Sequence, residues 1–92
     1  MIRSFRHRGL KRLYERGDRR RLNPDHIEKI EVILADLDAT ASIDHMRRPG
    51  YRLHPLSGDR KGFHAVDVSG NWRIVFRFEN GDVFDIDLID YH

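Results

Sequence analysis

Hydrophobic periodicity changes along the chain at the turn Arg48-Pro49-Gly50, and this change limits the fold to a few classes. Before this turn, apolar residues recur at the spacing of a helix, as between Ile27 and Leu37. After it, apolar and polar residues alternate with a period of two. A helical period does not suit a strand, and the reverse also holds. The chain is therefore predicted to be an α+β protein, with helices that precede a sheet.

The clearer of two predicted helices begins after Asn23. Asn23 is a favoured N-cap, Pro24 suits the first helical position, and Asp25 is favourable in the first turn. We expect this helix to end near Leu37 or Asp38. Its apolar stripe consists of Ile27, Ile30, Ile33, Leu34 and Leu37.

A shorter helix is predicted from His7 to Arg16. Leu10, Leu13 and Tyr14 have the spacing of one helical face, and Gly17 suits a left-handed stop. Before this helix, residues 2–5 form a short candidate strand.

An antiparallel meander is predicted for the second half of the chain. The polar stretch 58–62 and the segment Ser69-Gly70-Asn71 read as connections. The expected strands span residues 51–54, 63–68, 72–78 and 83–88, and one face of the sheet should pack on the helices.

The register of the last hairpin is predicted from its apolar residues. A two-residue Asn80-Gly81 turn would place Phe76 opposite Asp85 and bury a charge. A three-residue loop, with Gly81 in the left-handed last position, avoids this. That register pairs Trp72, Ile74 and Phe76 with Leu88, Ile86 and Phe84, makes Trp72 a core residue, and sets Arg73 opposite Asp87 and Arg77 opposite Val83.

The length of 92 residues predicts a single domain spanning residues 1–92. The absence of Cys excludes a disulfide scaffold, a thiolate metal site and a cysteine nucleophile. No apolar run approaches the roughly 20 residues that span a membrane, and no secretory signal is recognisable. We therefore expect a cytoplasmic protein without a membrane partner.

The net charge of +2 hides an uneven distribution. Residues 1–22 hold nine Lys or Arg and two acids, whereas residues 23–92 hold eight and thirteen. Such a basic segment is either a solvated face or, as we prefer, a surface that binds a polyanion. The residues expected to contact RNA are Arg3, Arg6, Arg8, Lys11, Arg12, Arg19, Arg20 and Arg21.

No motif for a metal, a nucleotide or a hydrolase nucleophile is present. The six His form no H-x-x-x-H or H-E-x-x-H pair, and the chain lacks G-x-x-x-x-G-K-[ST] and G-x-S-x-G. The terminal Asp90-Tyr91-His92 offers at most two ligands from one end. No metal and no cofactor are therefore expected.

The chain ends in Asp90, Tyr91 and His92 directly after an apolar strand. These residues are either a frayed tail or a group that moves protons and binds phosphate. Two residues on the sheet face away from the helices, His54 and Arg73, are candidates to join them. Arg73 alternatively pairs with Asp87, and His54 is alternatively an ordinary surface histidine.

Such a set is sufficient for a ribonuclease that uses no metal. A base takes the proton of a ribose 2′-hydroxyl, cationic donors stabilise the phosphate, and an acid protonates the leaving 5′-oxygen. The nucleophile belongs to the substrate, so the enzyme needs none of its own.

Four segments resemble HigB toxins of the RelE-like superfamily: residues 1–10, 51–59, 71–74 and 90–92. The resemblance implies the RelE-like microbial RNase fold and a ribosome-dependent endonuclease that cuts mRNA in the A site of the 70S ribosome. It implies neutralisation by a HigA-like antitoxin, through which alone operator DNA is contacted. It also implies a catalytic set of His54, Arg73, Asp90, Tyr91 and His92. One position departs from the pattern, because Ser57 stands where relatives often carry Lys.

Two other functions remain open from the sequence. The chain could be a binding module for RNA or protein without chemistry, which would tolerate loss of its last three residues. It could also be a toxin fold retained as a co-repressor, which would act only within an antitoxin–DNA complex.

Overall fold

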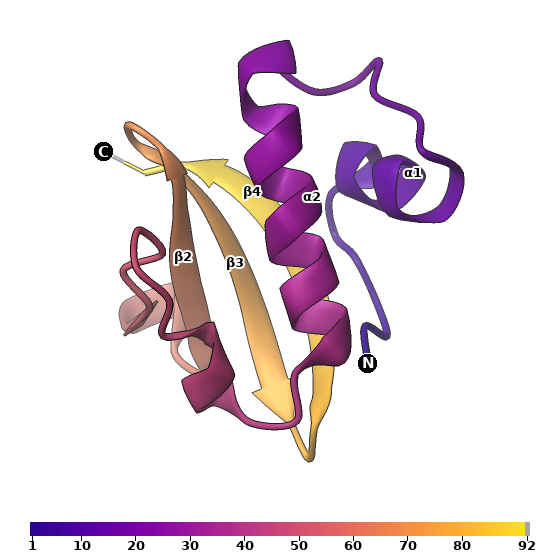
Figure 1. Ribbon diagram of the computed structural model, residues 1–92. Helices are drawn as coiled ribbons and strands as arrows, with labels where there is room; N and C mark the ends of the chain where they lie inside the picture. The colour runs from indigo at the N-terminus through magenta and orange to yellow at the C-terminus, as the bar shows by residue number, and fades with distance from the viewer. Residues whose placement is uncertain (92) are drawn as a thin grey trace.

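A computed structural model describes residues 1–91 of the protein. Its four strands form one antiparallel sheet in the order β1-β2-β3-β4, and helix α2 lies across one face of that sheet (Figure 1). Helix α1 lies beside α2, at the end of the sheet that β4 forms. The predicted α+β architecture is thus confirmed. Within residues 1–91, no helix is both long and apolar enough to cross a membrane.

Helix α1 spans Arg8–Arg16, one residue shorter at its start than predicted. The His7 side chain caps it, because Nδ1 accepts a hydrogen bond from the Leu10 amide at 3.1 Å. Gly17 ends it with a φ of +68°, a left-handed conformation that costs glycine little. The predicted stop signal is therefore confirmed.

Helix α2 spans Pro24–Ala39 and begins and ends close to the predicted residues. The Asn23 side chain accepts a hydrogen bond from the Asp25 amide at 2.9 Å, as an N-cap does. Its apolar stripe packs into the core, where Ile27, Ile30, Ile33, Leu34 and Leu37 are all buried.

After α2 the chain forms a short 3-10 helix, Ile43–Met46, and then the first strand of the sheet, β1, His54–Pro55. The predicted strand 51–54 is wrong over most of its length. Arg52 has a left-handed φ of +50°, which a strand residue outside a bulge does not adopt. Tyr51 is nevertheless buried, and its carbonyl accepts a hydrogen bond from the Asp67 amide at 2.7 Å.

The other three strands are confirmed, with longer limits than predicted. A second 3-10 helix, Gly58–Arg60, lies in the expected connection before them. The strands are β2, Phe63–Ser69, β3, Trp72–Glu79, and β4, Asp82–Asp90.

The predicted register of the last hairpin is wrong. Glu79 pairs with Asp82 around a two-residue turn in which Asn80 and Gly81 have φ values of +51° and +86°. Farther along, one residue of β3, Phe76, faces two residues of β4, Asp85 and Ile86. This β-bulge shifts the register by one residue, so neither a regular two-residue nor a regular three-residue hairpin describes the whole of this strand pair.

The two-residue turn does not bury an unpaired Asp85 carboxylate, because Asp85 lies at the bulge. Asp85 lies at the bulge with a φ of +56°, and its carboxylate accepts a hydrogen bond from Arg77 Nε at 2.9 Å. No unpaired charge is buried there. In a regular strand, residues three positions apart point to opposite faces. Because of the extra residue, the side chains of Val83 and Ile86 both point into the main core.

The observed register gives every predicted pair of this hairpin a different partner. Arg73 lies opposite Ile89 instead of Asp87, and Arg77 lies opposite Phe84 instead of Val83. Trp72 lies opposite Asp90, outside the core, with 36% of its surface exposed. The Trp72 ring lies 5.9 Å from that of His26 in α2.

The N-terminal candidate strand is reduced to two isolated parallel bridges. Ile2 pairs with Val83 and Phe5 with Ile86, so residues 2–5 cover the outer edge of β4. Strand β4 is therefore not a free edge over this stretch.

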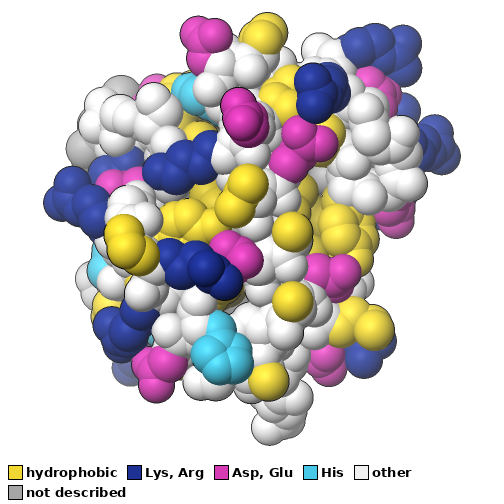
Figure 2. All heavy atoms as spheres, in the orientation of Figure 1, with side chains coloured by type: hydrophobic (Ala, Val, Ile, Leu, Met, Phe, Trp, Pro, Cys, Tyr) yellow, Lys and Arg dark blue, Asp and Glu magenta, His cyan; other side chains and the backbone are white. Residues whose placement is uncertain are grey.

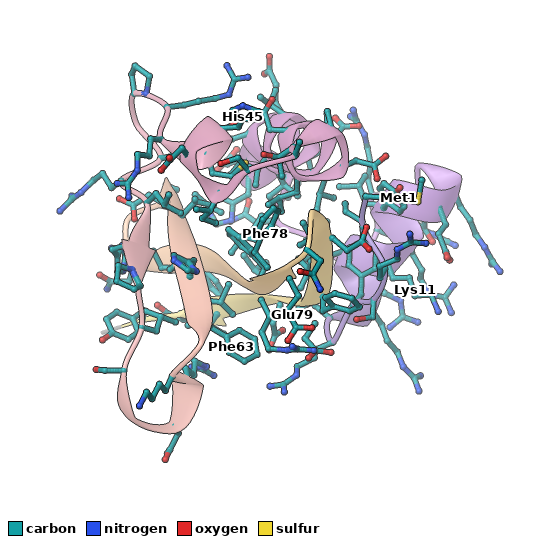
Figure 3. All side chains as sticks on the ribbon, turned by 90° about the horizontal axis from the view of Figure 1, so that it is seen from below. Met1, Lys11, His45, Phe63, Phe78 and Glu79 are labelled. Atoms are coloured by element: carbon teal, nitrogen blue, oxygen red, sulfur yellow. The ribbon has the colours of Figure 1, made fainter. Side chains whose placement is uncertain are left out.

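The two faces of the sheet have different surroundings. Phe78 lies between the sheet and α2, against the main core, whereas Phe63 points to the opposite side (Figure 3). There Phe63, Ala65 and Val75 form a second, smaller apolar cluster. No helix of the described chain covers this side, which we call the open face.

Candidate active site

Strand pairing places two predicted site residues on the open face. His54 lies opposite Ala65, and Arg73 lies opposite Asp67. Residues opposite each other in an antiparallel pair share a face, and Ala65 belongs to the open-face cluster. His54 and Arg73 therefore project from the same side, from the edge strand and from the third strand of the sheet.

The His54 ring is oriented by the backbone beside it. Its Nδ1 lies 2.8 Å from the Arg52 carbonyl oxygen. A carbonyl only accepts hydrogen bonds, so Nδ1 carries the proton in this contact. In the neutral ring, Nε2 is then the proton acceptor, as a general base requires.

The Arg73 side chain is largely buried and held by its neighbours. Its Nε lies 2.8 Å from Asp67 Oδ1, and its Nη1 donates to the Gly70 carbonyl at 2.7 Å. The alternative pairing with Asp87 is wrong, because Asp67 takes that place. A guanidinium has five N–H groups, so donors remain for a phosphate.

Tyr91 borders a hollow beside the loop that follows His54. The hollow is lined by Leu56, Ser57, Asp59, Arg60 and Tyr91. The Tyr91 amide donates to the Asn71 carbonyl at 2.7 Å, which fixes the chain end to the β2–β3 turn. Arg60 places a cation at the hollow that Ser57 also lines. The sequence did not reveal this role, because Arg60 lies in an ordinary polar loop.

The remaining two predicted site residues are Asp90 and His92. Asp90 lies opposite Trp72, whose ring packs near α2, so alternation directs Asp90 away from the open face. His92 lies outside the described residues. The structure thus brings His54, Arg73 and Tyr91 to one face, with Asp90 at the adjoining strand end.

The basic residues of the N-terminal segment differ in their surroundings. Arg8, Lys11 and Arg12 line a shallow hollow on α1 together with Glu15 and Arg16. Four others have close partners: Arg3 lies 3.2 Å from Asp82, Arg19 3.0 Å from Glu31, Arg20 3.0 Å from Asp18, and Arg6 over the Phe63 ring at 5.1 Å. Arg21, the last residue of the predicted set, is exposed.

A second basic region was missed by the sequence analysis. Residues 47–61 hold five Lys or Arg and one acid, a local excess that the balance of residues 23–92 conceals. Lys and Arg side chains gather both over the α1–α2 connection and over this segment (Figure 2). The members of the second region are Arg47, Arg48, Arg52, Arg60 and Lys61.

His64 is a histidine of a different kind from His54. It stacks against Phe76 with 6.2 Å between the ring centroids, on the helix side of the sheet. Burial lowers the pKa of His64, with the Arg47 charge as a further cause. Within residues 1–91, no group of three His, Asp or Glu side chains is placed to hold a metal ion.

Sequence comparison decides the family. A model of the HigB-like toxins, described as RelE-like toxins of type II toxin–antitoxin systems, matches residues 3–92. The chain belongs to the HigB-like toxin family. Endoribonuclease HigB of Proteus vulgaris is 41% identical over 92 residues, which is the full length of both chains. Toxin HigB-1 of Vibrio cholerae serotype O1 is 33% identical over 86 residues, 88% of this chain and 87% of its own.

Solved structures confirm the RelE-like fold of this HigB family member. A single-residue mutant of YafQ from E. coli superposes with a TM-score of 0.66 at 16% identity, covering 96% of this chain and 89% of its own. The YoeB–YefM heterotetramer from Staphylococcus aureus gives 0.63 at 15% identity, covering 100% and 95%. At these identities the likeness concerns the fold alone.

Proposed function

We propose that this HigB-family toxin is an endoribonuclease that cuts mRNA in the ribosomal A site without a metal ion. The endoribonuclease class rests on the full-length relationship to Endoribonuclease HigB of P. vulgaris. The dependence on the ribosome and the chemistry are proposed from the site and from the charge distribution.

The observation that carries the chemistry is the arrangement of His54, Arg73 and Tyr91 on the open face. A histidine with an accepting nitrogen, a fixed guanidinium and a phenol supply acid–base groups and phosphate donors. Together they suit in-line attack of a ribose 2′-hydroxyl on the adjacent phosphate.

In the proposed mechanism His54 Nε2 takes the proton from the 2′-hydroxyl. Its orientation supports this role over Asp90, which lies on the other side of the strand. Arg73 stabilises the charge that develops on the phosphate oxygens, and Tyr91 orients the phosphate. His92 is the proposed acid for the leaving 5′-oxygen, with Asp90 at the same chain end to support it.

In this proposal the ribosome positions the mRNA, which the small site cannot do alone. The site is an open sheet face with a shallow hollow, which offers little surface to grip a flexible RNA strand. The two basic surfaces, on residues 1–22 and 47–61, suit contacts with ribosomal RNA phosphates. We therefore assign substrate presentation to the ribosome and docking to these cations.

An antitoxin partner follows from membership in a type II toxin–antitoxin family. One similar fold, YoeB of S. aureus, is known in complex with YefM. For this chain we propose a HigA-like antitoxin, which alone would contact operator DNA.

The chemistry is tested by cleavage of mRNA bound to programmed ribosomes. An mRNA with one 2′-deoxynucleotide immediately 5′ of the scissile phosphate should resist cutting, whereas the all-ribose mRNA should be cut. Free mRNA should be cut far more slowly than ribosome-bound mRNA. Cutting of the deoxy substrate would contradict 2′-hydroxyl attack, and equal cutting of free mRNA would contradict dependence on the ribosome.

A test in cells separates the enzyme from the two alternatives. Induction of the wild type should arrest growth and produce mRNA ends in phase with the reading frame. Deletion of residues 90–92 should abolish both effects. A binding module would tolerate the deletion, and a co-repressor would leave growth and mRNA intact without its antitoxin.

A further inference from the structure

Asp67 is a largely buried carboxylate on the open face, outside the set of residues to which a role has been given. Its side chain is 15% exposed. Oδ1 lies 2.8 Å from Arg73 Nε, and Oδ2 lies 3.6 Å from Arg52 Nε. One carboxylate thus lies between two guanidinium groups.

The Asp67 backbone also contacts the segment that contains Arg52. Its amide donates to the Tyr51 carbonyl at 2.7 Å, on the segment that leads into His54. The next residue, Arg52, has a left-handed φ of +50°, a conformation that a non-glycine residue keeps only when its surroundings hold it. In this conformation the Arg52 carbonyl lies 2.8 Å from His54 Nδ1.

The contacts of Asp67 therefore lead to both proposed catalytic side chains. One path goes directly to Arg73. The other goes through the Arg52 side chain and the Tyr51 carbonyl to the carbonyl that fixes the His54 ring. His54 and Arg73 come from the first and third strands of the sheet, and Asp67 lies on the strand between them.

We infer that Asp67 is a positioning residue, which fixes the Arg73 guanidinium and the tautomer of His54 for the reaction. This inference rests on the proposed function. The carboxylate lies in ion-pair distance of Arg73 Nε, and the Asp67 side chain and amide contact the Tyr51–Arg52 segment, where the Arg52 carbonyl accepts a hydrogen bond from His54 Nδ1–H. Nε2 is then held as the base.

The first measurement is the tautomer of His54 by nitrogen NMR of the imidazole, which needs no activity. In the wild type, Nδ1 should be the protonated nitrogen of the neutral ring. In Asp67→Asn, which preserves size but removes the charge, the ring should lose this preference and give averaged shifts. An identical tautomer in both proteins would overturn the inference.

The second measurement is cleavage on programmed ribosomes. Because small displacements of reacting groups cost up to about 10²-fold in rate, Asp67→Asn should lower kcat by about that factor with little change in KM. The matched control is Asp44→Asn, which removes another carboxylate paired with an arginine, Arg47, at 3.0 Å. The control should cleave as the wild type does.

A double variant separates positioning from general stability. If Asp67 acts through Arg73 and His54, adding Asp67→Asn to Arg73→Ala should cost less than the product of the two single losses. Fully multiplicative losses, or an unchanged kcat in Asp67→Asn, would overturn the inference.

Failure of the inference is distinguishable from failure of the proposed function. If the wild type does not cut ribosome-bound mRNA, the proposed function fails and the inference that rests on it is overturned, whatever the tautomer. If the wild type cuts and His54→Ala does not, while Asp67→Asn cuts normally, only the inference fails.

Discussion

At the scale of the residue, Tyr51 shows how the segment before the site is anchored. Its hydroxyl donates to Asp36 Oδ2 at 2.6 Å, and Arg48 Nε lies 3.0 Å from the same oxygen. Burial, and the hydrogen bond to Asp36, raise the pKa of Tyr51 well above its usual range. The segment is thus tied to α2 by Tyr51 and to β2 by Asp67.

We predict that Tyr51→Phe lowers the free energy of unfolding by about 2 kcal/mol near neutral pH, because a hydrogen bond to a charged group is removed. The raised pKa gives this difference a pH dependence. The unfolded Tyr ionises above pH ~10, so wild-type stability falls there and the advantage over Phe shrinks. Urea unfolding of both proteins across this range checks the prediction. A difference that grew above pH ~10 would contradict it.

A second residue-scale prediction concerns the cation near Ser57. Arg60 borders the same hollow as Ser57 and Tyr91, and we expect it to supply the positive charge that Ser57 does not. Arg60→Gln should slow cleavage of ribosome-bound mRNA by about tenfold, in line with loss of a charged hydrogen bond of ~1.5 kcal/mol. Ser57→Lys added to Arg60→Gln should restore part of the rate, and no recovery would count against this role.

The sequence revealed some of these residues and not others, for a physical reason. His54 and the terminal residues are recognisable because their types and local strings carry the resemblance to HigB toxins. Asp67 and Arg60 are not, because a carboxylate in an alternating strand and an arginine in a polar loop are common. Their significance depends on which strand lies next to which, and that is fixed only in the folded chain.

At the scale of the element, the β3–β4 hairpin combines a tight turn with a bulge. Both turn residues have positive φ, which suits Asn and Gly. The bulge at Asp85 then shifts the register so that Val83 and Ile86 both reach the core. Strands β2, β3 and β4 and both helices could be predicted from periodicity and capping residues. The register of β3 and β4 could not be predicted, because the sequence of β4 does not show where a bulge interrupts the alternation of apolar and polar residues.

We predict that Gly81→Ala destabilises the protein by about 1 kcal/mol or more, because a φ of +86° is strained for any residue with a Cβ atom. Asn80→Gly is the matched control, since glycine accepts a φ of +51° readily, and its stability should stay close to that of the wild type. Thermal unfolding of both variants provides the measurement. An Ala variant as stable as the control would contradict the turn geometry.

At the scale of the whole molecule, charge is distributed over two surfaces. Arg8, Lys11 and Arg12 on α1 have no ion-pair partner within residues 1–91, whereas Arg19 and Arg20 are paired with acids. Binding of these cations to phosphates releases counterions, so ribosome binding should weaken steeply with salt.

Replacement of Arg8, Lys11 and Arg12 by Gln should reduce the slope of log affinity against log salt by roughly one for each phosphate that the variant no longer neutralises. Replacement of the paired Arg19 and Arg20 should change the slope less. Equilibrium binding to ribosomes at several salt concentrations measures both. A slope unaffected by the triple replacement would show that α1 does not bind the ribosome.

In the proposed mechanism, His54 and its neighbours on the open face perform the cut on the ribosome. The most direct test is the single-turnover rate of A-site mRNA cleavage by wild type and His54→Ala on programmed ribosomes, with melting curves to show that both are folded. Loss of a general base typically costs 10²–10⁴-fold, and we predict a decrease of about that size. A folded His54→Ala protein that cuts at the wild-type rate would contradict a catalytic role for His54.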